Sequence, residues 1–145
     1  MEKYHTLNIK KILKDFQQAE KEMFNNIVRL KSFIADEERL WIEIQKLEYS
    51  VLIDHRVIAL LSDSLQLINN KELLKLADLQ DIKHIHQLLV AYYPDNIQYQ
   101  EDLVAFVYNV LDDEAEALLL IGKFERQVKI TQNYFNKIKK EVRNR

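Results

Sequence analysis

The chain has no cysteine, one glycine, Gly122, and one proline, Pro94, among its 145 residues. Without cysteine it cannot form a disulfide, a thiol nucleophile or a thiolate metal site. A single glycine also excludes the glycine-rich loops that hold phosphates and dinucleotides. Folds rich in β-strands need many tight turns, which favour glycine and proline. The composition therefore predicts few, long elements and an all-α fold.

Segments long and apolar enough to span a membrane are also missing. Runs such as LLLI at 118–121 and VIALL at 57–61 are far shorter than the roughly 20 residues that a spanning helix needs. The N-terminal residues lack the apolar stretch of a secretory signal peptide. We expect a single soluble helical domain over residues 1–145, located in the cytoplasm.

Charge is distributed unevenly over the C-terminal half of the chain. No lysine or arginine lies between Lys83 and Lys123. Seven acidic residues fall in that interval: Asp95, Glu101, Asp102, Asp112, Asp113, Glu114 and Glu116. From Lys123 to Arg145 the sign reverses, with eight basic residues against Glu125 and Glu141. Such an asymmetry concerns partners and orientation and says little about the fold.

Apolar residues recur at steps of three and four along most of the chain, as on one face of an amphipathic helix. The first such stripe runs from about Leu7 to Ile34 and is interrupted at Glu37. We expect Asp36 to cap a new helix, with acidic residues in the first turn, where negative charge suits the helix dipole. A helix boundary is therefore expected at 35–37.

The second stripe covers residues 40–68 and predicts one continuous helix. Between Val51 and Leu61 this helix is apolar on more than one face, so we place it at the centre of the bundle. Asparagines at 69–70 are expected to end it, because asparagine tolerates the left-handed conformation. Residues 71–92 predict a further helix with a weak point near Asp78, so this stretch holds one helix or two.

The last part of the chain predicts a helical hairpin. It is separated from what precedes it by Pro94, which lacks an N–H and forces Tyr93 out of the helical region. The second arm is expected to run unbroken from about Asp113 to Val142, because its apolar stripe keeps its phase through Gly122. The expected fold is a bundle of five helices, or six if 71–92 divides, some of them long and coiled-coil-like.

Three residues of this hairpin match the first-helix aromatic, the small packing residue and the later aromatic of a known repeat: Tyr108, Ala117 and Phe124. On these positions the stretch at about 94–124 resembles a single tetratricopeptide-type unit, with Pro94 closing the unit before it. The resemblance implies a helical hairpin with that family's local geometry. The family's Trp, Leu and Gly positions in the first helix are replaced here by Glu101, Val104 and Ala105.

Two groups of polar residues have spacings that bear on chemistry. Asp81 and His84 have the carboxylate-x-x-His spacing of half a di-iron site, but no complete second pair precedes His55 or His86. Asp54 and His55 interrupt an apolar run, so a buried Asp54 needs a partner. They form either a polar acid–base site or a structural ion pair, and we expect the second. With no catalytic motif elsewhere, we expect no enzyme, no metal and no cofactor.

Candidate partner-binding residues lie at the turn of Pro94 and on the C-terminal helix. The tyrosines beside the turn look exposed, and tyrosine is a common anchor in interfaces. Four of the basic residues lie roughly opposite the apolar stripe: Arg126, Lys129, Lys137 and Lys140. Three roles are open for the basic helix: contact with phosphates of nucleic acid or of an anionic membrane, a face turned to solvent, or pairing with the acidic 95–116 segment of the same or another chain. The candidates are Tyr92, Tyr93, Tyr99, Arg126, Lys129, Lys137, Lys140 and Arg143.

These patterns favour a non-catalytic helical protein–protein interaction or assembly module, including self-association through the first or last helix. The alternative is a nucleic-acid-binding or regulatory protein that uses the basic C-terminal helix. A metal-binding helical bundle is the second alternative.

Overall fold

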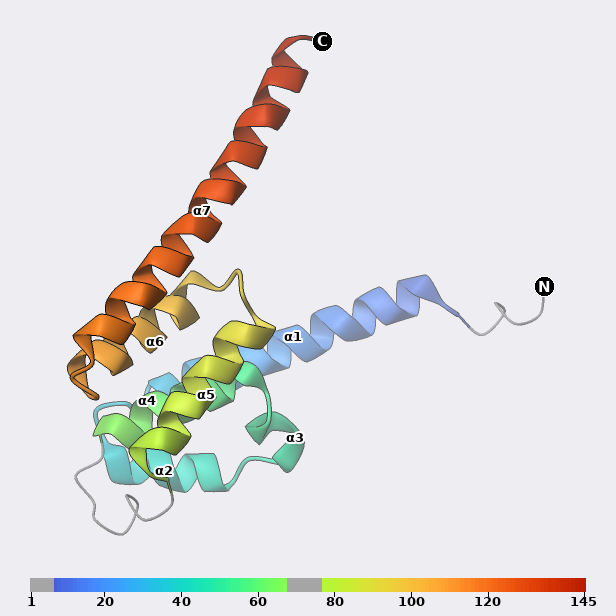
Figure 1. The fold of residues 1–145 in the computed structure, drawn as a ribbon. Helices are drawn as coiled ribbons and strands as arrows, with labels where there is room; N and C mark the ends of the chain where they lie inside the picture. Colours follow the sequence, from blue (N-terminus) through green and yellow to red (C-terminus); the bar gives the residue numbers. More distant parts are fainter. Residues whose placement is uncertain (1–6, 68–76) are drawn as a thin grey trace. The chain divides into compact units, whose positions relative to one another are not determined.

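The computed structural model describes residues 7–67 and 77–145, and this part of the chain is entirely helical apart from turns (Figure 1). The helices are α1 (Ile9–Lys31), α2 (Glu37–Gln45), α3 (Tyr49–Leu52), α4 (His55–Leu67), α5 (Leu79–Tyr92), α6 (Ile97–Asn109) and α7 (Glu114–Arg143). The all-α class is therefore confirmed. Not one helix within the described ranges combines the length and the apolar character needed to cross a membrane.

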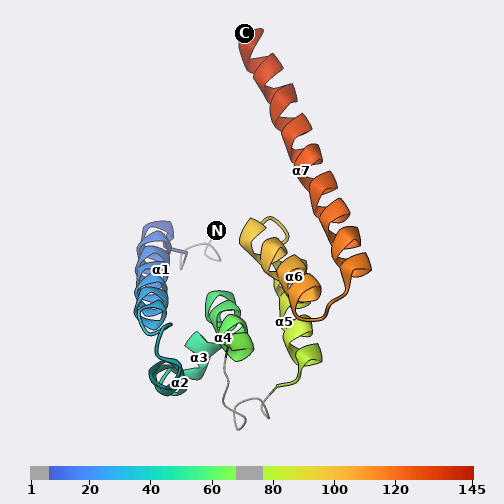
Figure 2. The same ribbon diagram turned by 90° about the vertical axis from the view of Figure 1, so that its left-hand side faces the viewer.

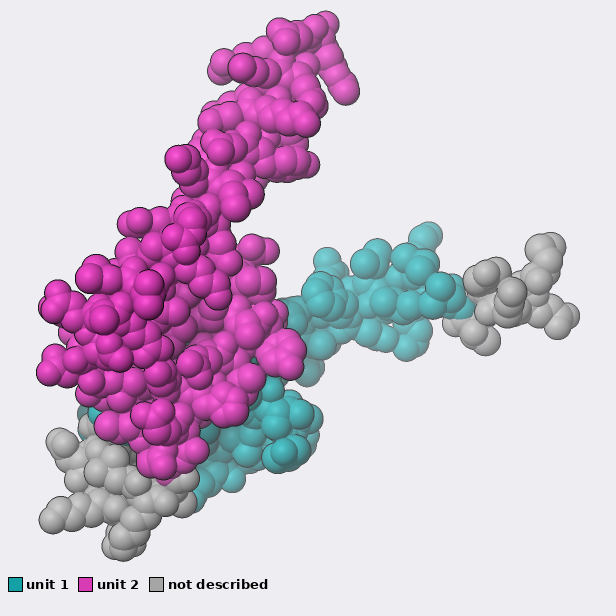
Figure 3. All heavy atoms as spheres, in the orientation of Figure 1, with its two compact units in different colours: residues 1–70 teal, residues 71–145 magenta. Residues whose placement is uncertain are grey.

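The chain divides into two compact units, residues 1–70 and 71–145, which are coloured separately in Figure 3. The first unit contains α1 to α4 and the second contains α5 to α7. Each unit is described by itself below.

The expected count of five or six helices is wrong, because residues 40–68 do not form one helix. They divide among α2, α3 and α4, which brings the described residues to seven helices. Asp54 begins α4 as its N-cap, and its Oδ1 accepts a hydrogen bond from the N–H of Arg56 at 2.9 Å. Glu48 is extended just before α3. The expected end at Asn69 and Asn70 lies outside the described residues.

The first unit has its core where α1 ends and α2 begins. Leu30 is fully buried in a cluster with Leu40, Ile44 and Leu60. The chain turns between α1 and α2, and Asp36 caps α2 by accepting a hydrogen bond from the N–H of Arg39 at 3.0 Å. The predicted boundary and its cap are confirmed.

The second unit is built on three helices that pack in sequence order, α5 on α6 and α6 on α7 (Figure 2). Each begins at a side-chain cap that accepts a hydrogen bond from a backbone N–H one turn later: Asp78, Asn96 and Asp113. Asp112 in the turn before α7 has a φ of 54°, a left-handed conformation that aspartate tolerates. The predicted helical hairpin and its break at Pro94 are confirmed.

Helix α7 is one continuous helix of 30 residues, as the unbroken apolar stripe predicts. Gly122 lies inside it without a positive φ, so it is not a C-cap. Among residues 7–67 and 77–145, a Cβ at this position would meet Nη1 of Arg126, at 3.5 Å, and no neighbouring backbone.

Helix α7 is also far longer than the helix it packs against. Its 30 residues extend about 45 Å, whereas the 13 residues of α6 extend about 20 Å. Near the start of α6, Gln100 Nε2 donates a hydrogen bond to Gln127 Oε1 at 3.5 Å. Residues 129–143, called the projecting segment below, continue beyond α6 in both ribbon views (Figures 1 and 2).

Candidate interaction site

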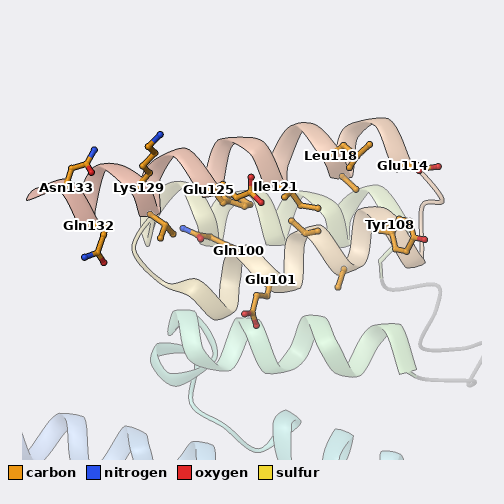
Figure 4. A pocket seen from close by; sticks show the side chains of 15 residues that line it. Gln100, Glu101, Tyr108, Glu114, Leu118, Ile121, Glu125, Lys129, Gln132 and Asn133 are labelled. Carbon is orange, nitrogen blue, oxygen red and sulfur yellow. The ribbon is translucent and has the colours of Figure 1, made fainter. Parts of the chain in front are cut away.

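An open groove of about 940 Å³ runs between α6 and α7 in the second unit (Figure 4). Its apolar wall consists of Val104, Ala105, Ala117, Leu118, Ile121, Phe124 and Val128. Figure 4 places Tyr108 and Glu114 at one end of the groove, and Gln132 and Asn133 at the other. The groove therefore extends along the length of α6 and the first part of α7.

The groove exists because α6 is apolar on two faces. Leu103, Phe106 and Val107 are buried on one face of the helix. Val104 and Ala105 lie on the other face and line the groove. A helix that is hydrophobic on several sides is one that other helices surround.

On α7 the groove residues follow a single stripe. Ala117 and Phe124 are buried against the unit, while Leu118 and Val128 stay 61% and 57% exposed. The same stripe continues at seven-residue steps from Val128 to Phe135 and Val142 on the projecting segment, where Ile138 lies beside them. Phe135 is 55% exposed. Helix α7 thus has one apolar face over its whole length, packed only in its first half.

Acidic residues predominate around the groove. Its charged lining consists of Glu101, Glu114, Glu125 and Lys129. The projecting segment has the opposite sign, with five basic residues against Glu141: Lys129, Lys137, Lys139, Lys140 and Arg143. The two halves of α7 therefore differ in charge while sharing one apolar stripe.

Comparison with protein families, curated proteins and solved structures found no match to the chain. The resemblance to a tetratricopeptide-type unit stays a prediction. Of the residues that suggest it, Ala117 and Phe124 are buried between the helices of the hairpin, and Tyr108 is exposed at the end of the groove.

The predicted tyrosine anchors differ in exposure. Tyr92 and Tyr93 are exposed, but Tyr99 is only 6% exposed, so the expectation that Tyr99 is exposed is wrong. Tyr99 precedes Leu103 and Phe106 by four and seven residues, which places it on the buried face of α6. Its ring meets that of Tyr93 edge-on, with the centroids 6.1 Å apart.

The predicted basic residues of α7, namely Arg126, Lys129, Lys137, Lys140 and Arg143, are all exposed. Within the described ranges no ion pair joins any of them to the acidic 95–116 segment. Glu116 pairs instead with Lys83 of α5, with Nζ and Oε2 2.8 Å apart. Lys129 lines the groove, and three of the others lie on the projecting segment.

Asp54 belongs to a structural ion pair, as expected. Arg56 donates from Nε to Asp54 Oδ1 at 2.9 Å and from Nη1 to Glu20 Oε2 at 2.7 Å, which joins the start of α4 to α1. The hydrogen bond from Arg56 lowers the pKa of Asp54 despite partial desolvation. Desolvation lowers the pKa of the neighbouring His55. The ion pairs of Arg56 therefore link α4 to α1.

One buried carboxylate was not foreseen from the sequence. Glu43 is 4% exposed, and its oxygens lie 3.1–3.3 Å from Arg29, Arg39 and Lys46. Desolvation raises the pKa of Glu43, but the hydrogen bond from Lys46 and the three positive charges together lower it below its ordinary value. The spacing to Arg39 and Lys46 was visible in the sequence, whereas Arg29 comes from another helix.

The histidine spacing that suggested a metal does not assemble a ligand set. Asp81 forms the capping box of α5 with Asp78, and His84 is exposed. His86 is buried, with its ring centroid 5.2 Å from that of Phe106, and desolvation lowers its pKa. Over residues 7–67 and 77–145, no three side chains of histidine, cysteine, aspartate or glutamate are grouped to hold a metal ion.

Proposed function

We propose that this chain is a non-catalytic helical protein–protein interaction or assembly module, and that the groove between α6 and α7 is its binding surface. The observation behind the proposal is the exposed apolar wall that includes Leu118, Ile121 and Val128. Contiguous apolar patches on soluble proteins mark sites of interaction. Laying an amphipathic helix into a hydrophobic groove is a recurrent mode of protein recognition.

The groove also favours a partner of particular charge. Three carboxylates and one ammonium line it, from Glu101, Glu114, Glu125 and Lys129. Complementary charge guides encounter and excludes partners of the wrong sign. The preferred ligand is therefore an amphipathic helix with basic residues beside its apolar face.

Two adjacent leucines provide a matched test. Leu118 lines the groove, whereas Leu119 does not and is 76% exposed. Because both side chains are exposed, Leu118→Glu and Leu119→Glu should both leave the hairpin folded, which circular dichroism checks. We expect Leu118→Glu to reduce recovery of the native partner from extracts of the source cells at least roughly tenfold, a loss of about 1.4 kcal/mol. Leu119→Glu should retain the partner.

Two results would contradict the proposal. One is equal recovery of the same partner by both variants, which would place binding elsewhere on the chain. The other is the absence of any specific protein, including a second copy of this chain, in captures with the unaltered protein.

A second candidate function is weak, nonspecific binding of nucleic acid by the exposed cations of α7. Lys129, Lys137, Lys140 and Arg143 supply it, and each phosphate contact contributes about 0.9 to the slope of log K against log salt. Replacing all four with glutamine should flatten that slope. Tight, sequence-specific binding that survives the replacement would argue against this candidate.

A further inference from the structure

Resting on the proposed interaction function, we propose that the groove receives the projecting segment of α7 from a second copy of the chain, forming an antiparallel homodimer. Each copy then offers both parts of the contact, a groove along the first half of α7 and an apolar, basic helix along the second. The occupant is a segment of known sequence, and the contact follows from its length, apolar stripe and charge.

The lengths agree. On α7 the groove runs from Glu114 to Asn133, about 29 Å, and the projecting segment of residues 129–143 spans about 21 Å. When two α7 helices lie side by side in opposite directions with full overlap, Arg143 of one copy meets Glu114 of the other. The symmetry axis then passes near Val128, and each projecting segment lies over the other copy's groove.

The apolar surfaces also agree. Phe135, Ile138 and Val142 continue the same stripe that lines the groove with Ile121 and Val128. In the antiparallel arrangement the exposed residues of the segment reach the exposed wall of the groove. A stripe with a seven-residue repeat is the pattern by which long helices pair along their length.

Charge decides the direction. The groove is lined mainly by carboxylates, whereas Lys139 and Arg143 flank the apolar residues of the projecting segment. Antiparallel pairing brings opposite signs together at both ends of the contact. Parallel pairing would place groove against groove and segment against segment, with like charges opposed.

Symmetry completes the contact. In an antiparallel pair related by a two-fold axis, the same surfaces are used by both copies and no groove is left open. The assembly therefore closes at two copies.

The first measurement is the mass of the full chain by sedimentation equilibrium, at concentrations up to about 100 μM, where even a weak dimer forms. We expect a dimer. Phe135→Glu should raise the dimer dissociation constant at least roughly tenfold. Ile130→Glu is the matched control, because Ile130 is 68% exposed but lies on the opposite side of α7 from the stripe. It should leave the dissociation constant unchanged.

Charge reversal tests the direction of pairing. Glu114→Lys with Glu125→Lys reverses the groove, and Lys139→Glu with Arg143→Glu reverses the segment; all four residues are exposed. Each double variant alone should dissociate more readily than the unaltered chain. An equimolar mixture of the two should form heterodimers, because both of its contacts again pair opposite signs. One chain with all four changes should dimerise by itself.

Several outcomes overturn the inference. They are a monomer at every concentration, a dimer insensitive to Phe135→Glu, or reversed variants that do not rescue each other. Failure here is distinguishable from failure of the proposed function: a monomer whose capture of another protein is abolished by Leu118→Glu refutes self-association alone. A monomer that captures nothing refutes both.

Discussion

Replacing Gly122 with alanine should stabilise the protein, because the glycine lies inside a continuous helix with no positive φ. Glycine in a helix interior is less favourable than alanine by roughly 1 kcal/mol, partly through the entropy of the unfolded chain. The added Cβ would meet only Nη1 of Arg126 at 3.5 Å, an ordinary contact with the end of a flexible side chain. No steric cost offsets the gain.

We therefore expect the free energy of unfolding of the second unit to rise by about 0.5–1 kcal/mol. For a unit of this size the change corresponds to a rise in melting temperature of about 4–8 °C for each kcal/mol. Urea and thermal unfolding followed by circular dichroism measure it. Both proteins should be compared at two matched concentrations, because association of the folded state raises the apparent stability.

Gly122→Asn supplies the control that separates a helix interior from a helix end. In a continuous helix the order of stability should be alanine, then asparagine, then glycine. At a left-handed C-cap the order reverses, since glycine and asparagine tolerate that conformation and alanine does not. A reversed order, or no gain with alanine, would refute the reasoning.

Two further predictions concern single polar residues. Asp54→Ala should lower stability by about 1–2 kcal/mol through loss of the α4 cap, and Asp54→Asn by less, as urea unfolding will show. For Asp54→Asn, the loss of stability relative to the unaltered protein should shrink as the pH falls below 3.8, the ordinary pKa of aspartate, because the lowered folded pKa makes ionised Asp54 fully stabilising only above that value. Burial lowers the pKa of His86 in the folded protein, although the charge of Asp102 opposes the shift. The contribution of neutral His86 to the free energy of unfolding is therefore complete above pH 6.5 and is lost as the pH falls toward the folded pKa. His86→Phe should make the free energy of unfolding less dependent on pH below 6.5. Equal pH dependence in the variant and the unaltered protein would contradict this prediction.

Local patterns were sufficient to predict the boundaries that depend on single residues. Asp36 precedes α2 and accepts the hydrogen bond expected of a cap, and α5 begins after Asp78, where a weak point was expected. Pro94 separates α5 from α6, and the phase of the apolar stripe predicted continuity through Gly122. In each case the deciding interaction lies within one turn of the residue, so the sequence contains all of it.

The division of residues 40–68 was missed because their apolar stripe stays in phase across two helix ends. Asp54 falls on that stripe and was interpreted as an interior residue, although an aspartate before an apolar run also begins a helix. Tyr99 was misplaced for a related reason, since its burial depends on which face of α6 packs inside the unit. Both outcomes depend on tertiary contacts that periodicity does not specify.

The candidate site was predictable only in part. The reversal of charge along α7 and the basic residues of its second half are visible in the sequence. The groove is not visible in the sequence, because it combines Val104 and Ala105 of α6 with residues of α7. These two residues line a groove only because Leu103 and Phe106, on the other face of α6, are the ones buried inside the unit. The charges of this surface can therefore be predicted from local residues, whereas its shape depends on how α6 and α7 pack.

The length of α7 connects the groove with the self-association inferred from it. A helix of about 12–15 residues is marginally stable in water without packing, and residues 129–143 extend beyond α6 with Phe135 and Val142 exposed. Burying that stripe in the groove of a second copy would stabilise both the segment's helix and the apolar wall it covers. A partner that binds only the helical form shifts the helix–coil equilibrium toward that form. Helicity of the projecting segment and occupancy of the groove are therefore expected to rise together with protein concentration.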